Sequence, residues 1–392
     1  MKILISSDLY WPTINGVSMF ARNLAKGLAD RGHEVMVIAP SQIGKKYKQV
    51  DGNYTIARTA STIFPFYQNF RICVYPYIEV KKIIKEFDPD VIHTQTFIMI
   101  GQAVMKYSQK YDIPLVSTNH AMPENLMDNL KSLAPVSRPI RYMLKKYILR
   151  FNLKTDYLTM PTQSALDIFG LPARKMKVPI EAVSNGIDLS RFTVGQPSTD
   201  VMYKFSLPTD KPVITYVGRI DAEKHISVLI DAFVHLLAKL DAHLLIVGSG
   251  TELDNLKAQV DGLGISDKVT FTGRVTDQEI VDLHKAGTVF CMPSPAELQS
   301  IALLEAMASG KPVVAVDAGP LKELCQDNIN GILCETDNDN EISMALMRII
   351  TDPTLAESMG QQSLKIASNH DLQKTLDRFE QIYTDLINSK KS

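Results

Sequence analysis

The sequence is short of the features that mark membrane-spanning and secreted chains. No uninterrupted apolar run approaches the ~18 residues of a membrane-spanning helix. The apolar start is broken by Asp8 and Pro12, unlike a signal peptide. The formal net charge is only −1, so no chain-wide field would recruit nucleic acid, and any anion site must be local. We therefore expect a cytoplasmic protein, with a location on a membrane surface left open.

Cysteine is also scarce, and its spacing does not suggest a metal centre. The 392 residues include four cysteines: Cys73, Cys291, Cys325 and Cys334. Three of them lie in apolar or strand-like surroundings, which predicts buried, reduced thiols in a cytoplasmic protein. No aspartate motif for a metal is present either. We expect neither a metal nor another cofactor.

The first half of the chain alternates short apolar strands with helices. A strand is expected at Lys2–Ser6, and a helix over residues 17–31, where Phe20, Leu24 and Leu28 recur on one side. Further strands are expected at residues 34–39, residues 91–93, Leu115–Thr118 and Tyr157–Met160. Continuous apolar strands separated by helices are typical of a parallel sheet covered on both faces.

The second half repeats this pattern. Strands are expected at Val213–Val217, His243–Val247, Val269–Phe271, Val289–Met292 and Val313–Val316. Asn185 and Gly186 mark a turn between the halves, and Asp352 before Pro353 suits the start of a helical stretch to about residue 387. We expect an α/β protein with doubly wound domains at residues 1–184 and 185–365. Residues 366–392 are expected to form a C-terminal helix that packs back on the first domain.

Two segments follow strands of the second half, at the sheet edge where open α/β sheets bind ligands. In residues 218–224, Arg219 and Lys224 flank a tight strand-to-helix connection. A guanidinium suits a bidentate phosphate contact, and an ammonium supplies a second point charge. Without further evidence, the plain interpretation of such a pair is two solvated surface cations. In residues 297–310, Glu297 precedes an apolar helix that contains Glu305.

A glutamate inside an apolar helix needs a partner, because an unpaired buried charge is costly. A ribose diol is a suitable partner for Glu305, since a carboxylate accepts hydrogen bonds from two adjacent hydroxyls. The helix start near Ser300 and Ile301 could donate N–H groups to a diphosphate. The plain alternative is a helix-capping Glu297 and an ion-paired Glu305.

Taken together, these motifs resemble the signature of the retaining, GT-B-fold glycosyltransferases of family 4. That fold has two Rossmann-like domains that face each other across a cleft. Other matching segments, which extend the resemblance over almost the whole chain, are residues 8–12, 15–17, 90–95, 118–120, 184–188, 247–250, 271–273 and 310–315.

The resemblance implies roles for particular residues. Arg219 and Lys224 would hold the donor diphosphate, Glu297 would contact hydroxyls of the transferred sugar, and Glu305 would bind the ribose. His120 would lie beside the transferred sugar, although a lone histidine after a strand is more often structural, as we interpret His93. The remaining implied donor-binding residues are Gly16, Gly273, Arg274, Gln299, Ser300 and Ile301.

Two departures from the family pattern qualify these roles. The usual Glu-Gly-Phe-Gly run is Glu297-Leu298-Gln299-Ser300 here. This difference leaves open which sugar hydroxyls the neighbours of Glu297 would bind. The common Gly-Gly pair after the last strand is Gly319-Pro320, which alters one donor near the sugar or phosphate.

No candidate nucleophile for a covalent intermediate stands out in the sequence. We therefore expect a front-face displacement through an oxocarbenium-like state, in which the β-phosphate accepts the acceptor proton. Arg219, Lys224 and the helix start would stabilise the charge that develops on the phosphate. Two such cations can do the electrostatic work of a metal ion.

Residues 137–154 interleave cations with an apolar stripe at helical spacing. The stripe with its adjacent cations suits a helix lying on an anionic membrane. It suits equally a helix whose stripe packs on the sheet while its basic face is solvated. A second apolar segment, residues 63–67, could meet lipid, line an acceptor groove or belong to the core. The candidate acceptor and membrane residues are Arg138, Arg141, Lys145, Lys146, Phe64, Phe66 and Tyr67.

Within the family, this pattern and residues 119–125 resemble the diacylglycerol glucosyltransferase and phosphatidylinositol mannosyltransferase branches. The resemblance implies transfer of a hexose from UDP-glucose to a lipid such as diacylglycerol, by a peripheral protein on the inner face of the cell membrane. Alternatives are a hexosyltransferase that uses a UDP-sugar or GDP-mannose on a soluble or polysaccharide acceptor, and a nucleotide-sugar-binding pseudo-enzyme. A nicotinamide dehydrogenase is disfavoured, because residues 6–16 lack G-x-G-x-x-G.

Overall fold

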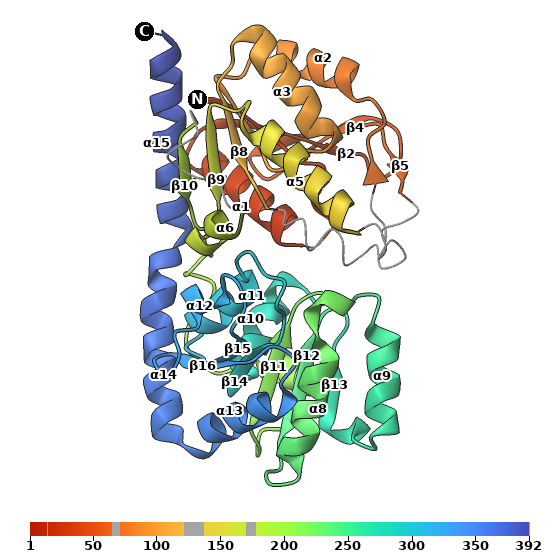
Figure 1. The fold of residues 1–392 in the computed structure, drawn as a ribbon, viewed down its shortest axis with the longest axis vertical. Helices are drawn as coiled ribbons and strands as arrows, with labels where there is room; N and C mark the ends of the chain where they lie inside the picture. The colour runs from red at the N-terminus through yellow and green to blue at the C-terminus, as the bar shows by residue number, and fades with distance from the viewer. Residues whose placement is uncertain (14, 65–70, 121–136, 170–177, 392) are drawn as a thin grey trace. The chain divides into compact units, whose positions relative to one another are not determined.

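The computed structural model describes residues 1–13, 15–64, 71–120, 137–169 and 178–391. In one helix it gives the side chains of Tyr142–Leu144 and of residues 146–152, but not those of residues 137–141 or of Lys145. The chain forms two compact units, each with its own sheet (Figure 1). Unit 1 contains Met1–Asn185 with Gln373–Ser392, and unit 2 contains Gly186–Leu372.

The described part of unit 1 contains an eight-stranded sheet with the strand order β10-β9-β8-β7-β1-β2-β4-β3. Every neighbouring pair is parallel except β3 with β4. In β1 the consecutive residues Ile3, Leu4 and Ile5 are all fully buried, as expected for a sheet covered on both faces. The strands are β1 Lys2–Ser6, β2 Glu34–Pro40, β3 Tyr47–Asp51, β4 Tyr54–Thr59, β7 Val91–Thr94, β8 Leu115–Thr118, β9 Tyr157–Met160 and β10 Ile180–Ala182.

Helices cover this sheet, and the last one returns to it from the end of the chain. In α15, Phe379 and Tyr383 are fully buried, and Arg378 binds Glu181 of β10 at 2.6 Å, so α15 runs beside that edge strand (Figure 1). A separate small hairpin pairs β5 Thr62–Ile63 with β6 Arg71–Ile72. The helices are α1 Gly16–Asp30, α2 Tyr77–Phe87, α3 Met99–Tyr111, α5 Ser137–Asn152, α6 Gln163–Phe169 and α15 Leu372–Lys391.

Unit 2 contains a six-stranded, wholly parallel sheet with the order β13-β12-β11-β14-β15-β16. Its strands are β11 Val213–Val217, β12 His243–Val247, β13 Val269–Phe271, β14 Val289–Met292, β15 Val313–Val316 and β16 Gly331–Cys334. Its helices are α7 Thr199–Lys204, α8 Ile226–Leu237, α9 Leu253–Gly262, α10 Asp277–Ala286, α11 Ile301–Ala308, α12 Leu321–Leu324, α13 Asp339–Thr351 and α14 Pro353–Ala367.

The predicted fold class is confirmed, since both units are doubly wound α/β structures. Prediction missed the polar strands β3 and β4, the edge strands β10 and β16, and a break in the C-terminal helical stretch. Asp352 does cap the stretch at Pro353, but the stretch divides into α14 and α15 at Ser368–His370. The break has a tertiary cause, because the backbone of Ile187 bonds to His370 and Leu372, as part of a bridge with Asp371.

The four cysteines are buried and free, as predicted. Among the described residues, no group of three or more His, Cys, Asp and Glu side chains is arranged to hold a metal ion. In the same part of the chain, none of the helices combines the length and the apolar character that crossing a bilayer requires.

Candidate functional site

The order of strands in unit 2 identifies the edge where a ligand would bind. The chain passes from β11 to β12 and β13 on one side, and then to β14, β15 and β16 on the other. Open parallel sheets bind ligands at the carboxyl ends of the strands where the order reverses, which here is between β11 and β14. The predicted segments, residues 218–224 and 297–305, follow these two strands.

Arg219 is held in place by two carboxylates. Its guanidinium forms ion pairs with Asp221 and with Glu223, which is almost completely buried. Asp221 in turn accepts hydrogen bonds from the Thr251 backbone N–H at 2.9 Å and the Thr251 hydroxyl at 3.0 Å. The Tyr216 hydroxyl donates to the Arg219 carbonyl at 2.8 Å. The position of the guanidinium is therefore defined by its own loop and by the loop after β12.

Lys224 and Glu297 meet although 73 positions separate them in the chain. The Lys224 Nζ lies 2.6 Å from Glu297 Oε1, and their side chains are only 12% and 14% exposed. The Ser294 hydroxyl donates to the Glu223 carbonyl at 3.2 Å, which joins the loop after β14 to the loop after β11. The structure thus brings Arg219, Lys224 and Glu297 to one place at the carboxyl edge of the sheet.

The start of α11 follows directly. Ser300 is its N-cap and accepts a hydrogen bond from the Leu303 N–H at 3.3 Å, so Ile301 is the first helical residue. The Ser300 hydroxyl is therefore engaged in capping, and the backbone N–H groups of this turn are the donors it can offer. Gln299 is buried, with its Nε2 3.4 Å from His370 Nδ1.

Glu305, in the second turn of α11, has a histidine partner. Its Oε2 lies 3.3 Å from Nε2 of His284, a residue of α10. The Glu305 side chain is 16% exposed and the His284 side chain is completely buried. The sequence expectation that Glu305 needs a partner is met within the protein by His284, which sequence reasoning did not single out.

Glycine allows the loops after β11, β12 and β13 to approach one another. Gly248 has a φ of +139°, and a Cβ there would lie 1.9 Å from the Gly218 carbonyl oxygen. Gly248 also forms a bridge with Gly273. Arg274 donates from Nε to the Ser249 hydroxyl at 3.2 Å. Gly273 and Arg274 therefore lie beside the loops that follow β11 and β12.

The corresponding point in unit 1 lies between β1 and β7, where Asp8 follows β1. Its carboxylate accepts hydrogen bonds from the Thr96 hydroxyl at 2.6 Å and from the Ile100 N–H at 2.9 Å. Asp8 is fully desolvated, and burial raises the pKa of its carboxyl. We interpret Asp8 as a structural link between the first loop and the start of α3.

His120 follows β8 close to this point. Its Nε2 lies 2.9 Å from Gln95 Oε1, and its ring packs on Phe20 with a centroid distance of 5.0 Å. Burial lowers the pKa of His120 to about 3, so the imidazole is neutral at pH 7. Gly16 begins α1, and a Cβ there would meet no atom of the described residues within 4 Å.

Helix α5 divides its apolar stripe between the core and solvent. Ile148 and Phe151 are buried, whereas Tyr142 and Met143 are each 68% exposed and Tyr147 is 45% exposed. The buried part of the stripe agrees with packing on unit 1, and for the exposed part contact with a membrane remains a prediction.

The other candidate acceptor residues are placed to different extents. Lys146 is exposed on α5, and Phe64 is half-buried. The side chains of Arg138, Arg141 and Lys145 lie outside the described residues, as do Phe66 and Tyr67.

Unit 1 also exposes apolar side chains, of which only Ile63 belongs to a segment that the sequence singled out. They lie in and after the small hairpin: Ile63, Val74, Tyr75 and Ile78, each more than 60% exposed. The signal available in the sequence was the apolar, aromatic run around Tyr75, just before α2.

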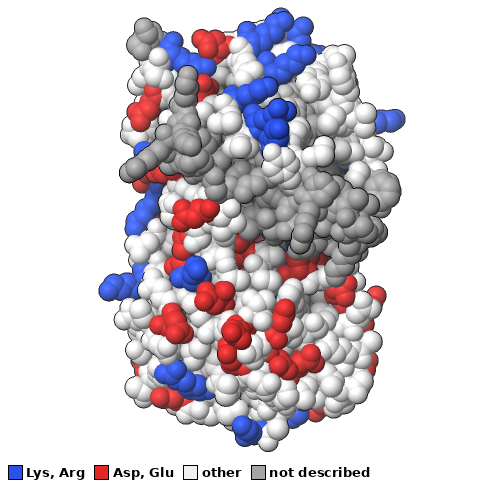
Figure 2. Space-filling view, in the orientation of Figure 1, with Lys and Arg blue, Asp and Glu red and all other residues white. Residues whose placement is uncertain are grey.

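Charge is divided unequally between the units. The residues of unit 1 include 28 Lys and Arg against 17 Asp and Glu, whereas those of unit 2 include 14 Lys and Arg against 26 Asp and Glu. The net charge of −1 therefore hides values of +11 and −12. On the face shown in Figure 2, Lys and Arg gather on unit 1 around α3 and α5, and Asp and Glu dominate unit 2.

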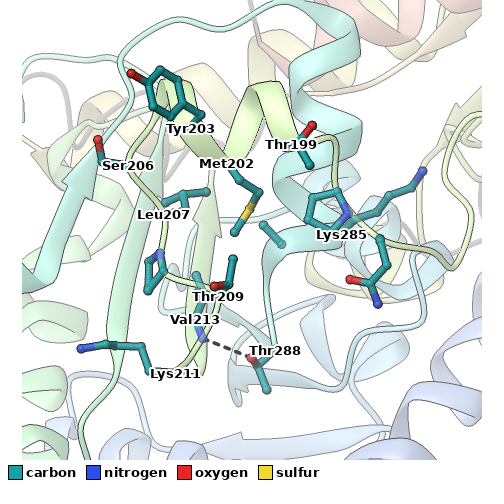
Figure 3. A pocket seen from close by; sticks show the side chains of 14 residues that line it. Thr199, Met202, Tyr203, Ser206, Leu207, Thr209, Lys211, Val213, Lys285 and Thr288 are labelled. Carbon is teal, nitrogen blue, oxygen red and sulfur yellow. Dashed lines mark hydrogen bonds between the residues drawn. The ribbon is translucent and has the colours of Figure 1, made fainter.

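A groove in unit 2 lies away from these residues. It has a volume of about 1060 Å³ and is lined by residues such as Met202, Leu207 and Lys285 (Figure 3). Two other lining residues share a hydrogen bond of 3.1 Å: Val213, which begins β11, and Thr288, which directly precedes β14. The groove is thus at the amino edge of the sheet and includes none of the predicted site residues.

Two family models match the chain, one for each half. Residues 14–191 match the model described as Glycosyltransferase Family 4, and residues 199–366 match the model described as Glycosyl transferases group 1.

A relative and two solved structures are similar to this chain over nearly its whole length. An alpha-monoglucosyldiacylglycerol synthase of Streptococcus pneumoniae is 27% identical over 99% of this chain and 86% of its own length. The sucrose-phosphate synthase structure from Thermosynechococcus elongatus has a TM-score of 0.81 at 20% identity, covering 99% of this chain and 100% of that one. Anabaena Alr3699/HepE in complex with UDP-glucose has a TM-score of 0.73 at 20% identity, covering 98% and 100%.

The structural matches show the fold, and the family models cover both halves of the chain. The paired strand-end loops of unit 2 carry the residues that the sequence pattern identified. The chain is therefore a glycosyltransferase of the GT-B fold, with a Glycosyltransferase Family 4 region followed by a Glycosyl transferases group 1 region.

Proposed function

We propose that this glycosyltransferase moves glucose from UDP-glucose to a lipid acceptor such as diacylglycerol, with retention of configuration, at the inner face of the cell membrane. The observation that carries the donor half is the largely buried Lys224–Glu297 pair beside Arg219 at the carboxyl edge of the unit 2 sheet. Alr3699/HepE is described in complex with UDP-glucose, and the Streptococcus pneumoniae relative is named for a glucosylated diacylglycerol, which supports both halves of the proposal.

The pairing of the cations suggests how the donor binds. A diphosphate competes with the carboxylates for Arg219 and Lys224, because it presents several charged oxygens to the two cations. When Lys224 turns to phosphate, Glu297 is released to accept hydrogen bonds from sugar hydroxyls. Diphosphate binding and sugar recognition are thus coupled through one ion pair.

The same cations serve the transfer step. The acceptor oxygen attacks the anomeric carbon on the face from which the diphosphate departs, and the β-phosphate accepts the acceptor's proton. Arg219, Lys224 and the N–H groups at the start of α11 stabilise the negative charge on the departing diphosphate. The neutral His120 contacts the transferred sugar without acting as a cation. We propose that no metal is required, so that dialysis against a chelator leaves turnover unchanged.

The acceptor half is supported by unit 1. A net charge of +11 favours an anionic surface, and exposed apolar side chains on α5 and near the small hairpin can enter the interface of a bilayer. Buried Ile148 and Phe151 anchor α5 to the unit while Tyr142 and Met143 remain available. We propose that unit 1 holds the enzyme on the membrane as a peripheral protein.

A thermal-shift panel of UDP, GDP, UDP-glucose and GDP-mannose tests the donor. A ligand that binds only the native state raises its stability by mass action, so UDP and UDP-glucose are expected to raise the Tm. Stabilisation by the guanine nucleotides alone would overturn the assigned donor. No response to any of the four would overturn the proposed function.

Transfer itself is tested with the donor that stabilises the protein. Vesicles containing diacylglycerol and an anionic lipid are expected to yield an α-linked glycolipid from UDP-glucose, which proton NMR of the anomeric signal identifies. A β-linked product would contradict retention. Hydrolysis of the donor with no glycolipid formed would contradict a lipid acceptor.

A further inference from the structure

The buried His284 beside Glu305 is a polar group with only half of its hydrogen-bonding capacity used. Its side chain is completely inaccessible to solvent, and its ring lies 5.8 Å from the rings of Phe192 and Phe290. Nε2 faces Glu305 Oε2 at 3.3 Å, whereas Nδ1 has no hydrogen-bond partner among the described residues. An unsatisfied buried polar atom is destabilising, so a purely apolar side chain would suit this pocket better.

The contact determines which nitrogen carries the proton. A carboxylate oxygen can only accept, so the Nε2 that faces Glu305 must be the N–H donor. The other nitrogen, Nδ1, makes no hydrogen bond to the described residues. Because the His284 side chain is completely buried between Phe192 and Phe290, it offers Glu305 Oε2 a donor at a fixed place in the core.

We infer that His284 is a positioning residue for nucleotide recognition. It engages Oε2 and thereby orients the second oxygen, Oε1, to accept the hydroxyls of a ribose. The inference rests on the proposed function, which gives Glu305 the ribose, and it deepens it by naming the residue that makes Glu305 selective. A glutamate on a short helix would otherwise sample several rotamers, and each hydrogen bond to the ligand would have to order it.

Calorimetric titration of the full-length protein with UDP and with 2′,3′-dideoxy-UDP tests this role. The wild type is expected to bind UDP about 10- to 100-fold more tightly than the dideoxy analogue, since hydrogen bonds to a charged group are lost in the analogue. His284→Phe keeps a planar ring of similar size but removes the donor. It is expected to weaken UDP binding about 5- to 10-fold and to leave binding of the analogue unchanged.

Two further variants separate positioning from packing. His284→Gln retains an N–H donor and is expected to recover most of the preference for UDP. Glu305→Gln is expected to lose the preference by itself, and adding His284→Phe to it should change the ratio no further, because both act through one contact. Should His284→Phe fail to fold, His284→Leu, which also lacks the donor and suits the apolar pocket, replaces it in the same titrations.

The outcomes distinguish this inference from the proposed function. Equal weakening of both ligands by His284→Phe would mean that the residue only supports packing, and would overturn the inference. A wild type that binds UDP without preferring it to the analogue would overturn it too, while the proposed donor class stands. A wild type that binds neither would overturn the proposed function and the inference together.

Discussion

Units 1 and 2 share a doubly wound design but carry opposite charge, +11 against −12. The difference shows that the proposed binding of a nucleotide sugar and the proposed binding of a membrane depend on electrostatic interactions over different distances. Unit 2 is predicted to bind an anion although its net charge is negative, so recognition must come from two fixed cations with their carboxylate partners. Unit 1 carries a surplus of Lys and Arg, whose field acts over distances that suit an extended anionic surface.

The comparison predicts that a single change in unit 2 abolishes chemistry without affecting membrane binding. Arg219→Ala is expected to lower turnover at least ~100-fold, because it removes roughly 3 kcal/mol of stabilisation of the departing diphosphate. Vesicle binding should be unaffected. Steady-state transfer assays and flotation on anionic vesicles measure the two effects.

Arg348→Ala is the matched control, since Arg348 is an exposed arginine of unit 2 that donates to the Asn328 side chain at 2.7 Å, away from the strand-end loops. It should behave as wild type in both assays. Near-normal turnover of Arg219→Ala would remove the guanidinium from the mechanism.

A second experiment alters the charge of unit 1 and is expected to affect membrane binding but not donor binding. Lys146 and Arg150 are exposed on α5, and replacing both with Glu is expected to weaken binding to anionic vesicles at least ~10-fold, given about 1 kcal/mol per basic residue near such a surface. UDP affinity should not change. Flotation and calorimetry report these quantities.

Lys257→Glu with Lys365→Glu applies the same charge change to exposed positions of unit 2. If this pair weakened vesicle binding as much as the α5 pair did, total charge rather than the surface of unit 1 would be responsible.

A smaller effect concerns the stability of unit 1 in acid. Burial and the neighbouring His120 lower the pKa of His93 to about 3, whereas an unfolded histidine titrates near 6.5. Between these values the unfolded chain binds one more proton than the folded one, so stability falls as the pH falls from about 6.5 toward 3. His93→Gln should reduce this slope between pH 6 and 4 by up to about 1.4 kcal/mol per pH unit.

Fluorescence can follow that unfolding in unit 1 alone, because the single tryptophan of the chain, Trp11, belongs to it. Denaturant titrations of the wild type and the variant at several pH values give the two slopes. Equal slopes would show that His93 is protonated to the same extent in the folded and unfolded states.

The parts of the fold that could be predicted are those in which a local pattern and the tertiary structure agree. Continuous apolar strands such as Val213–Val217 were predicted with their observed limits. The hairpin strands Tyr47–Asp51 and Tyr54–Thr59 were missed because β3 is an exposed, polar edge strand. The break before α15 was missed because it depends on pairing with Ile187, far away in the chain.

The residues of the candidate site also divide into those that a local sequence pattern identified and those that only the fold brings together. The charges of the strand-end loops are a local feature, so Arg219, Lys224 and Glu297 could be identified from the amino-acid sequence. Their partners Asp221 and Glu223 were visible only as nearby acidic residues, and nothing in the pattern of α10 indicated that His284 would meet Glu305. The charge difference between the units was present in the sequence, but a net value for the whole chain concealed it.

Hydrogen–deuterium exchange of the wild-type protein with and without UDP tests the central claim most directly, because it locates the diphosphate on one unit. Slower exchange is predicted for the backbone amides of residues 218–224 and of the first turn of α11, where N–H groups and the cations meet the phosphates. Protection confined to unit 1, or absent from both of these segments while UDP is bound, would contradict the account.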